Sequence, residues 1–183
     1  MAVHIVTDSA CDLTDEQVAA NDITVVPLSI RFGDDEFVDR EQLGVADFYK
    51  RMADFEGLPE TSAPSPGAFE VAFRNAKDAG ADAVVCINLS GKLSATIEAA
   101  RAAQRSLEGE LDVRVIDSLS ITAGLATQVL EAARAAREGK SADEIEALVA
   151  DLVARIDILA TLDTLDNLKK GGRIGGAQAL VGG

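Results

Sequence analysis

The sequence predicts an α/β fold in which a mostly parallel sheet is flanked by helices. Short apolar runs rich in β-branched residues alternate along the chain with longer segments of helical periodicity, an order typical of a parallel sheet with helices on its faces. Two helix starts carry the spacing of a capping box, Thr14 with Gln17 and Ser141 with Glu144. Polar clusters follow several of the apolar runs, and ligands bind at such strand ends in parallel sheets.

The composition favours one compact domain and excludes several classes of partner. The chain has 183 residues, of which 48% are hydrophobic, enough for the core of a domain of ordinary size. Its net charge of −14 argues against nucleic acid or an anionic membrane surface as a partner. Neither a membrane-spanning run nor a signal peptide is present, so we expect a cytoplasmic protein. The spacing of Cys11 and Cys86 fits neither a disulfide framework nor a metal site, so both thiols are expected to be reduced.

The first part of the chain is expected to contain a strand, a polar loop, a brief helix, a second strand and a hairpin. Pro27 interrupts the second strand, because proline lacks the N–H that a ladder needs, and it belongs at a sheet edge or a break in pairing. The hairpin turns at Gly33. These elements are expected at residues 4–7, 8–13, 14–20, 23–29 and 31–38.

The remaining elements follow the same alternation. The proline-rich segment 57–67 is predicted to be an exposed loop, and it ends where Ser65 and Pro66 suit the cap and first position of a helix. The expected elements are a helix at 45–55, a helix at 66–79, a strand at 83–88, a helix at 94–107, a strand at 113–116, two long helices, a last strand at 158–161 and a short helix at 163–170.

The chain is organised around residues 84–96, where a buried strand runs into a polar turn and then into a helix. The first turn of a helix leaves about four backbone donors unpaired and carries roughly half a positive charge, so a carboxylate or phosphate is stabilised there. Ser94 is predicted to lie at this helix start. Its hydroxyl either contacts such an anion or only caps its own helix. Asp8 and Asp117, at two other strand ends, either line the same cleft or make loop hydrogen bonds, and we favour the loop role.

Six motifs occur in the order found in the DegV family, and the chain resembles that family over nearly its whole length. The motifs are Thr7-Asp8-Ser9 with Asp12-Leu13, Val25-Val26-Pro27-Leu28, residues 61–66, residues 90–96, Val115-Ile116-Asp117-Ser118, and residues 170–176. The resemblance implies a bacterial protein whose residues 1–183 form a DegV-like N-terminal lobe. Residues from about 163 to 183 are then the connection toward a second lobe, which is missing here.

The resemblance also implies a lipid-binding function. Proteins of the family carry fatty acids, and some serve as the binding subunit of a fatty-acid kinase, holding the acyl chain between two lobes while a partner phosphorylates the carboxylate. We therefore expect a non-catalytic subunit that sequesters a long-chain fatty acid and presents its carboxylate to a partner kinase. Neither a cofactor nor a metal is expected.

Hydroxyl groups are expected to hold the carboxylate. The resemblance assigns this role to Thr61 and Ser94 and places Arg173 in the same region, and we expect the neighbouring Ser62 and Thr96 to be further donors. A turn hydroxyl that bonds its own backbone is the alternative for Thr61. The basic cluster at 169–173 either opposes a helix dipole or contacts an anion.

The chain departs from the family at a few positions. Ala95 and Ile97 stand where the family usually has a glycine and an aromatic residue. The second lobe supplies a carboxylate-contacting histidine in the family, whereas His4, the sole histidine here, matches no such position and is expected at the surface of a strand end. Weak lipid retention with self-association through an exposed apolar patch remains an alternative.

A small phosphatase-like α/β enzyme is the competing hypothesis. It would handle phosphate esters with Asp8 and the basic cluster at 169–173. The hydrolase elbow, the phosphate loop and the dinucleotide fingerprint are all absent from the sequence. We therefore favour the lipid carrier.

Overall fold

A computed structural model describes residues 1–173, which belong to two compact units. The first unit contains Met1–Leu28 and Ala63–Asp157, and the second contains Ser29–Ser62 and the described residues from Ile158 to Arg173. Among the described residues, no helix combines the length and the apolar content that crossing a bilayer requires.

The first unit is built on a four-stranded sheet with the order β2-β1-β6-β7. Each neighbouring pair of strands is parallel, which confirms the predicted fold class. All residues of the central strand β6 are buried, because helices cover both faces of a parallel sheet. The strands are β1 (Val3–Asp8), β2 (Ile23–Val26), β6 (Ala83–Asn88) and β7 (Asp112–Asp117).

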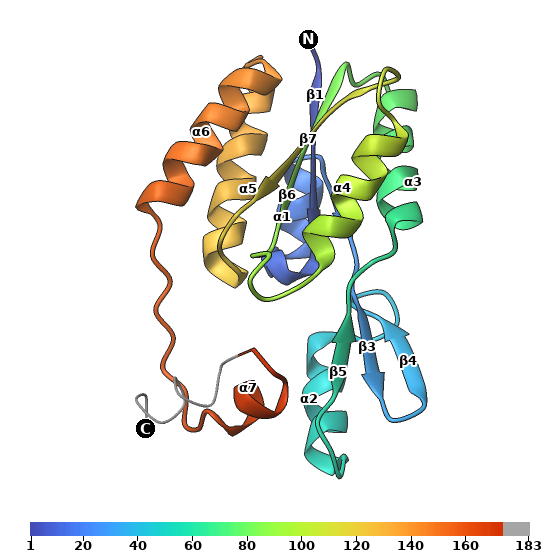
Figure 1. The fold of residues 1–183 in the computed structure, drawn as a ribbon, viewed down its shortest axis with the longest axis vertical. Helices are drawn as coiled ribbons and strands as arrows, with labels where there is room; N and C mark the ends of the chain where they lie inside the picture. The colour runs from blue at the N-terminus through green and yellow to red at the C-terminus, as the bar shows by residue number, and fades with distance from the viewer. Residues whose placement is uncertain (174–183) are drawn as a thin grey trace. The chain divides into compact units, whose positions relative to one another are not determined.

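Two pairs of helices cover the two faces of this sheet (Figure 1). The pair α5 (Thr122–Arg137) and α6 (Ala142–Arg155) lies on one face, and the pair α3 (Pro66–Asp78) and α4 (Thr96–Ser106) lies on the other. Successive strand residues point to opposite faces, so β1 and β6 contribute to both cores. One core includes Ile5, Val85, Ile87, Leu125, Val129 and Ile145, and the other includes Val6, Val84, Cys86, Phe69, Phe73 and Leu107.

Three of the predicted helix starts are confirmed. Thr14 and Ser141 each form a capping box, at α1 (Asp15–Ala20) and at α6. Ser65 caps α3, its hydroxyl accepting the N–H of Ala68 at 3.2 Å, and Pro66 is the first residue of that helix. These local signals act within one turn of helix, which is why the sequence alone places them correctly.

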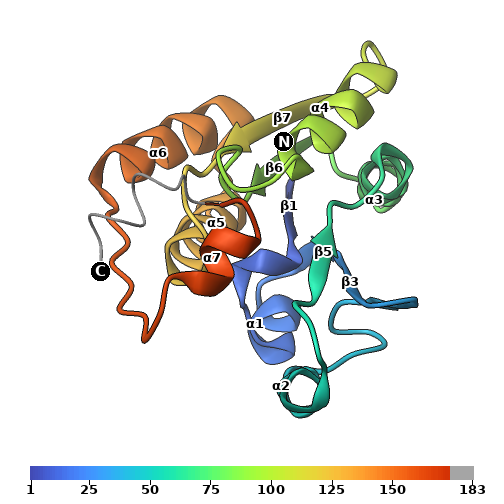
Figure 2. The same ribbon diagram turned by 60° about the horizontal axis from the view of Figure 1, so that its bottom comes forward.

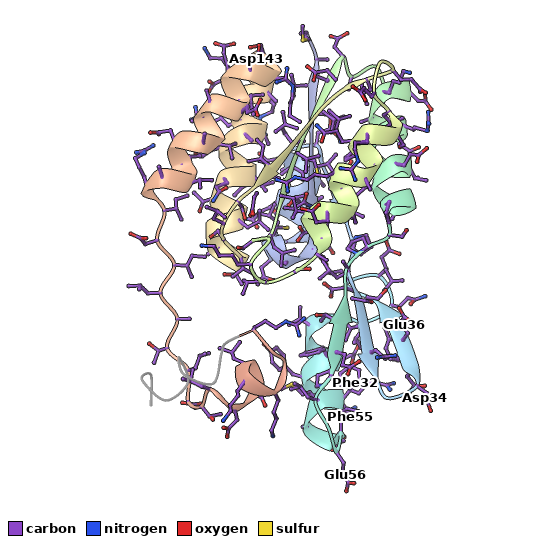
Figure 3. All side chains as sticks on the ribbon, in the orientation of Figure 1. Phe32, Asp34, Glu36, Phe55, Glu56 and Asp143 are labelled. Carbon is purple, nitrogen blue, oxygen red and sulfur yellow. The ribbon has the colours of Figure 1, made fainter. Side chains whose placement is uncertain are left out.

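The second unit contains a small antiparallel sheet of order β4-β3-β5 and the helices α2 and α7. Figure 2 shows α2 beside this sheet. The rings of Phe32 and Phe55 meet edge to face with centroids 5.3 Å apart, and both are labelled in Figure 3. The turn of the predicted hairpin contains Gly33 at φ +62°. The elements are β3 (Ser29–Phe32), β4 (Asp35–Val38), α2 (Val45–Asp54), β5 (Glu60–Ser62) and α7 (Asp166–Lys170).

One predicted loop and one predicted strand were wrong. The segment 57–67 is not wholly a loop, because Glu60–Ser62 forms β5 and pairs with β3. Its short, polar and exposed sequence has no alternation that would signal a strand. Residues 158–161 form no strand. Leu159 is 97% exposed, and an apolar run becomes a strand only when another strand satisfies its backbone.

The break predicted at Pro27 is confirmed, whereas His4 differs from its expected surface position. β2 ends at Val26 and β3 begins at Ser29, in separate sheets. The ring of His4 is half-buried, with Nε2 2.8 Å from Thr24 Oγ1. Burial lowers the pKa of His4 and outweighs the opposing effect of Asp22.

Candidate functional site

The carboxyl ends of β1 and β6 are joined by the buried carboxylate of Asp8. Its Oδ2 accepts the N–H of Leu89 at 2.9 Å and the side-chain amide of Asn88 at 3.0 Å. Its Oδ1 accepts the N–H of Ala10 at 3.1 Å. Burial raises the pKa of Asp8, and the three hydrogen bonds only partly oppose that effect. Asp8 therefore has the loop role that we favoured, and it fixes the point where the chain leaves β6.

Acceptors from the end of β7 hold the next two residues of this turn. Ser90 donates its N–H to the carbonyl of Ser120 at 2.8 Å. Gly91 donates its N–H to the carboxylate of Asp117, with the nitrogen 3.2 Å from each oxygen. The backbone donors of residues 89, 90 and 91 are therefore committed to the protein itself. An anion at this edge of the sheet must be bound by other groups.

The hydroxyls of Ser94 and Thr96 are the polar groups that follow this turn, and they lie together. The two oxygens are 2.8 Å apart, and Ser94 Oγ also accepts the N–H of Thr96 at 3.2 Å. Thr96 is fully buried, whereas Ser94 is half-buried. The hydroxyl of the half-buried Ser94 is thus held in place by a residue that is closed to solvent.

The structure corrects the predicted helix start at this point. α4 begins at Thr96, its N-cap is Ala95, and no side chain caps it. Ser94 lies one residue before the cap and binds the backbone two residues ahead, as serine often does in turns. The anion-stabilising end of the helix dipole is therefore at Thr96, and the Ser94 hydroxyl lies beside it.

Thr61 and Ser62 lie in the second unit on β5. Thr61 is opposite Ile30 and Ser62 is opposite Ser29 in the ladder with β3. Both side chains are exposed. β5 fixes their backbone, so Thr61 is a strand residue and not a turn residue. Their approach to Ser94 remains a prediction.

Arg173 and the two lysines of the basic cluster also belong to the second unit. Lys169 and Lys170 occupy the last turn of α7, as expected of cations that oppose a helix dipole. Arg173 is exposed and donates from Nη1 to the carbonyl of Gly171 at 2.6 Å. A role of this cluster in anion binding remains a prediction, and residues 174–176 of the motif lie outside the described residues.

Sequence reasoning missed the reason why glycine occupies position 91. A Cβ at this residue would lie 2.9 Å from Asp117 Oδ2 and 3.3 Å from Ile97 Cγ2. The close approach of the two strand ends therefore favours a residue without a side chain, because a Cβ here would force the Asp117 carboxylate to shift. The signal was present as the Ser90-Gly91 pair, but the partner that makes glycine necessary is distant in sequence.

Comparison with known proteins places this geometry in a family context. The family model described as "Uncharacterised protein, DegV family" matches residues 2–183. A DegV domain-containing protein from Deinococcus radiodurans is 40% identical over 183 residues, which is 100% of this chain and 64% of the relative. The chain thus spans slightly less than two thirds of that relative's length.

Solved structures share the fold at similar coverage. A structure of a DegV family protein from Thermus thermophilus, described by its fatty acid binding, has a TM-score of 0.88 and 33% identity over 100% of this chain and 64% of its own. A stearic acid-binding protein from Eubacterium ventriosum has a TM-score of 0.83 and 31% identity over 96% of this chain and 61% of its own. The similarity therefore covers both units of this chain.

Proposed function

Because the chain belongs to the DegV family, we propose that it binds a long-chain fatty acid, sequesters the acyl chain and holds the carboxylate at the Ser94 hydroxyl. The observation that carries the proposal is the half-buried residue Ser94, whose hydroxyl is held by buried Thr96 at the first turn of α4. The proteins from Thermus thermophilus and Eubacterium ventriosum, both described as binding fatty acids, support the choice of ligand.

The chemistry of a fatty acid suits a site of this kind. Burying each methylene contributes about 0.8 kcal/mol, so the tail supplies most of the affinity. Burying an unpaired carboxylate costs several kcal/mol, so donors must converge on the head group. The proposed donors are the hydroxyls of Thr61, Ser62 and Ser94, with Thr96 behind Ser94 and Arg173 as the cation.

We further propose that the bound carboxylate is presented to a separate kinase. In that reaction a carboxylate oxygen attacks the γ-phosphorus of ATP, and acyl phosphate and ADP are formed. The exposed cations Lys169, Lys170 and Arg173 suit contact with a phosphate-bearing or acidic partner surface. Since the reaction consumes ATP, the proposal includes a cytoplasmic location.

Native mass spectrometry of the purified chain tests the lipid proposal. The expected result is a complex whose extra mass equals that of a long-chain fatty acid, released on denaturation and identified by its fragments. A chain that stays empty after incubation with a series of long-chain fatty acids would contradict the proposal. For the kinase step, ATP and a fatty-acid kinase catalytic subunit should yield an acyl phosphate that hydroxylamine traps, and only when the lipid-loaded chain is present.

The competing phosphatase hypothesis needs an accessible Asp8. The side chain of Asp8 is fully buried, and both of its carboxylate oxygens accept N–H groups. A nucleophile or a general base must reach its substrate. The geometry of Asp8 therefore favours the carrier over the enzyme.

A further inference from the structure

We propose that Thr96 is a positioning residue that makes the Ser94 hydroxyl a dedicated donor toward a carboxylate. This inference rests on the proposed function and adds a selectivity mechanism to it. Among the described residues, the hydroxyl of Thr96 has one hydrogen-bond partner, Ser94 Oγ, at 2.8 Å. Thr96 is fully buried, so neither solvent nor a ligand competes for that bond.

The count of donors and acceptors at Ser94 decides what its hydroxyl can offer. A serine hydroxyl has one hydrogen to donate and two lone pairs to accept with. The N–H of Thr96 occupies one lone pair of Ser94 Oγ at 3.2 Å. If the Thr96 hydroxyl donates to Ser94 as well, both lone pairs are used, and the hydrogen of Ser94 is the one function left.

The direction of the bond between the two hydroxyls therefore sets the chemistry of the site. With Thr96 as donor, Ser94 faces a ligand with its hydrogen, which a carboxylate accepts. With Ser94 as donor, it would face the ligand with a lone pair, which a carboxylate repels. A bound carboxylate selects the arrangement in which Thr96 donates to Ser94. Thr96, Ser94 and the ligand are then linked by consecutive hydrogen bonds, and each of these bonds polarises the next.

Position 96 also holds the Ser94 side chain in place. Thr96 is the first residue of α4, and its backbone N–H and its hydroxyl both bind Ser94 Oγ. A two-point contact from one buried residue restricts the Ser94 rotamer. A β-branched side chain at position 96 keeps its own rotamer restricted as well.

Two substitutions separate the hydroxyl of Thr96 from its shape. Thr96→Val keeps the branched shape and removes the donor, whereas Thr96→Ser keeps the donor. We expect Thr96→Val to weaken the binding of hexadecanoic acid at pH 8 about tenfold. The variant loses the hydrogen bond from Thr96 to Ser94, which supports the bond from Ser94 to the charged carboxylate. Thr96→Ser should bind with an affinity close to that of the unaltered chain. Displacement of a fluorescent fatty acid measures both values, and circular dichroism verifies the fold.

Hexadecan-1-ol separates the proposed role of Thr96 from a merely structural one. If Thr96 only maintained the shape of the site, Thr96→Val would weaken the binding of the alcohol and of the acid equally. The alcohol both donates and accepts, so it bonds Ser94 in either direction, and Thr96→Val should leave its affinity unchanged. Equal weakening for acid and alcohol, or no weakening for the acid, overturns the assignment of Thr96 and leaves the lipid proposal intact. Failure of the unaltered chain to bind either probe overturns both. If Thr96→Val does not fold, Thr96→Ala provides the donor-free variant with a residue that favours helices.

Discussion

The amide of Gly91 lies against the carboxylate of Asp117, with its nitrogen 3.2 Å from both oxygens. Gly91 follows β6, and Asp117 is the last residue of β7. The same carboxylate accepts the N–H of Leu119 at 2.9 Å. Two turns at one edge of the sheet are thus joined through one side chain, and the turn after β6 leads to Ser94.

Gly91→Ala should destabilise the chain by about 1 kcal/mol, the lower end of the cost of an extra methyl group in a packed position, because the contact is at the surface. The added Cβ would lie 2.9 Å from Asp117 Oδ2, and a shift of the carboxylate would disturb the hydrogen bonds that it accepts from Gly91 and Leu119. Urea unfolding measures the change. Gly67→Ala is the matched control, because it lies in α3 with its nearest atom 3.8 Å away. A Gly91→Ala chain as stable as the control would contradict the tight contact.

Asp8→Asn should reduce stability at every pH, because the NH2 group replaces one acceptor oxygen and would face a donor in either orientation, Ala10 N–H on one side or the donors of Leu89 and Asn88 on the other. The loss should be about 1–3 kcal/mol at neutral pH, the penalty for unsatisfied buried polar groups.

The pH dependence of this loss has a definite sign. The folded-state pKa of Asp8 is raised above 3.8, so the folded chain holds the proton more tightly than the unfolded chain. The additional stability that comes from this tighter proton binding is fully present below the unfolded value and is lost as the pH rises through the folded value, whereas the hydrogen bonds to Asp8 remain at neutral pH. The gap between the unaltered chain and Asp8→Asn should therefore widen on acidification. If the difference in stability between the two chains narrowed on acidification, the hydrogen bonds would lower the pKa of Asp8 by more than burial raises it.

Glu144→Gln should show the opposite dependence. The N–H of Ser141 and the ammonium of Lys140 lower the pKa of Glu144 from 4.5 to about 2. The stability that this carboxylate contributes is present above pH 4.5 and is lost as the pH falls through about 2. Thermal unfolding across this range should show the unaltered chain losing its advantage over the variant. An advantage that is independent of pH would exclude an ionised capping residue.

Ser94→Ala should lower the affinity for a long-chain fatty acid by about 1–3 kcal/mol, the cost of removing a hydrogen bond to a charged group. Isothermal titration with hexadecanoic acid measures the loss. Ser106→Ala serves as the control at the other end of α4, where the hydroxyl donates to the carbonyl of Ala103. Equal affinity of Ser94→Ala and the unaltered chain would remove Ser94 from the proposed site.

The predicted elements that proved correct depend on short-range patterns. The capping boxes at Thr14 and Ser141 involve residues three positions apart, and the buried run of β6 is visible in six consecutive residues. The hydroxyl of Ser94 was proposed as a site group in the same way, from its place after a strand, and that role stays a prediction. The sequence did not predict that Ser94 lies before the start of α4. The end of the turn depends on the backbone N–H groups of residues 89–91, which are held by Asp8, Ser120 and Asp117.

By itself the sequence determined the α/β class, the parallel order of strands and helices, the helix caps and the family. Each of these is encoded by residues close together in the chain or by motifs in a set order. Tertiary structure alone decided that Glu60–Ser62 pairs with β3, that residues 158–161 stay outside any sheet, and that a side chain at position 91 would press on Asp117. These features depend on residues that are distant in the sequence. A strand needs a neighbouring strand for its hydrogen bonds, and a close contact needs a second segment of the chain. No local sequence pattern predicts either partner.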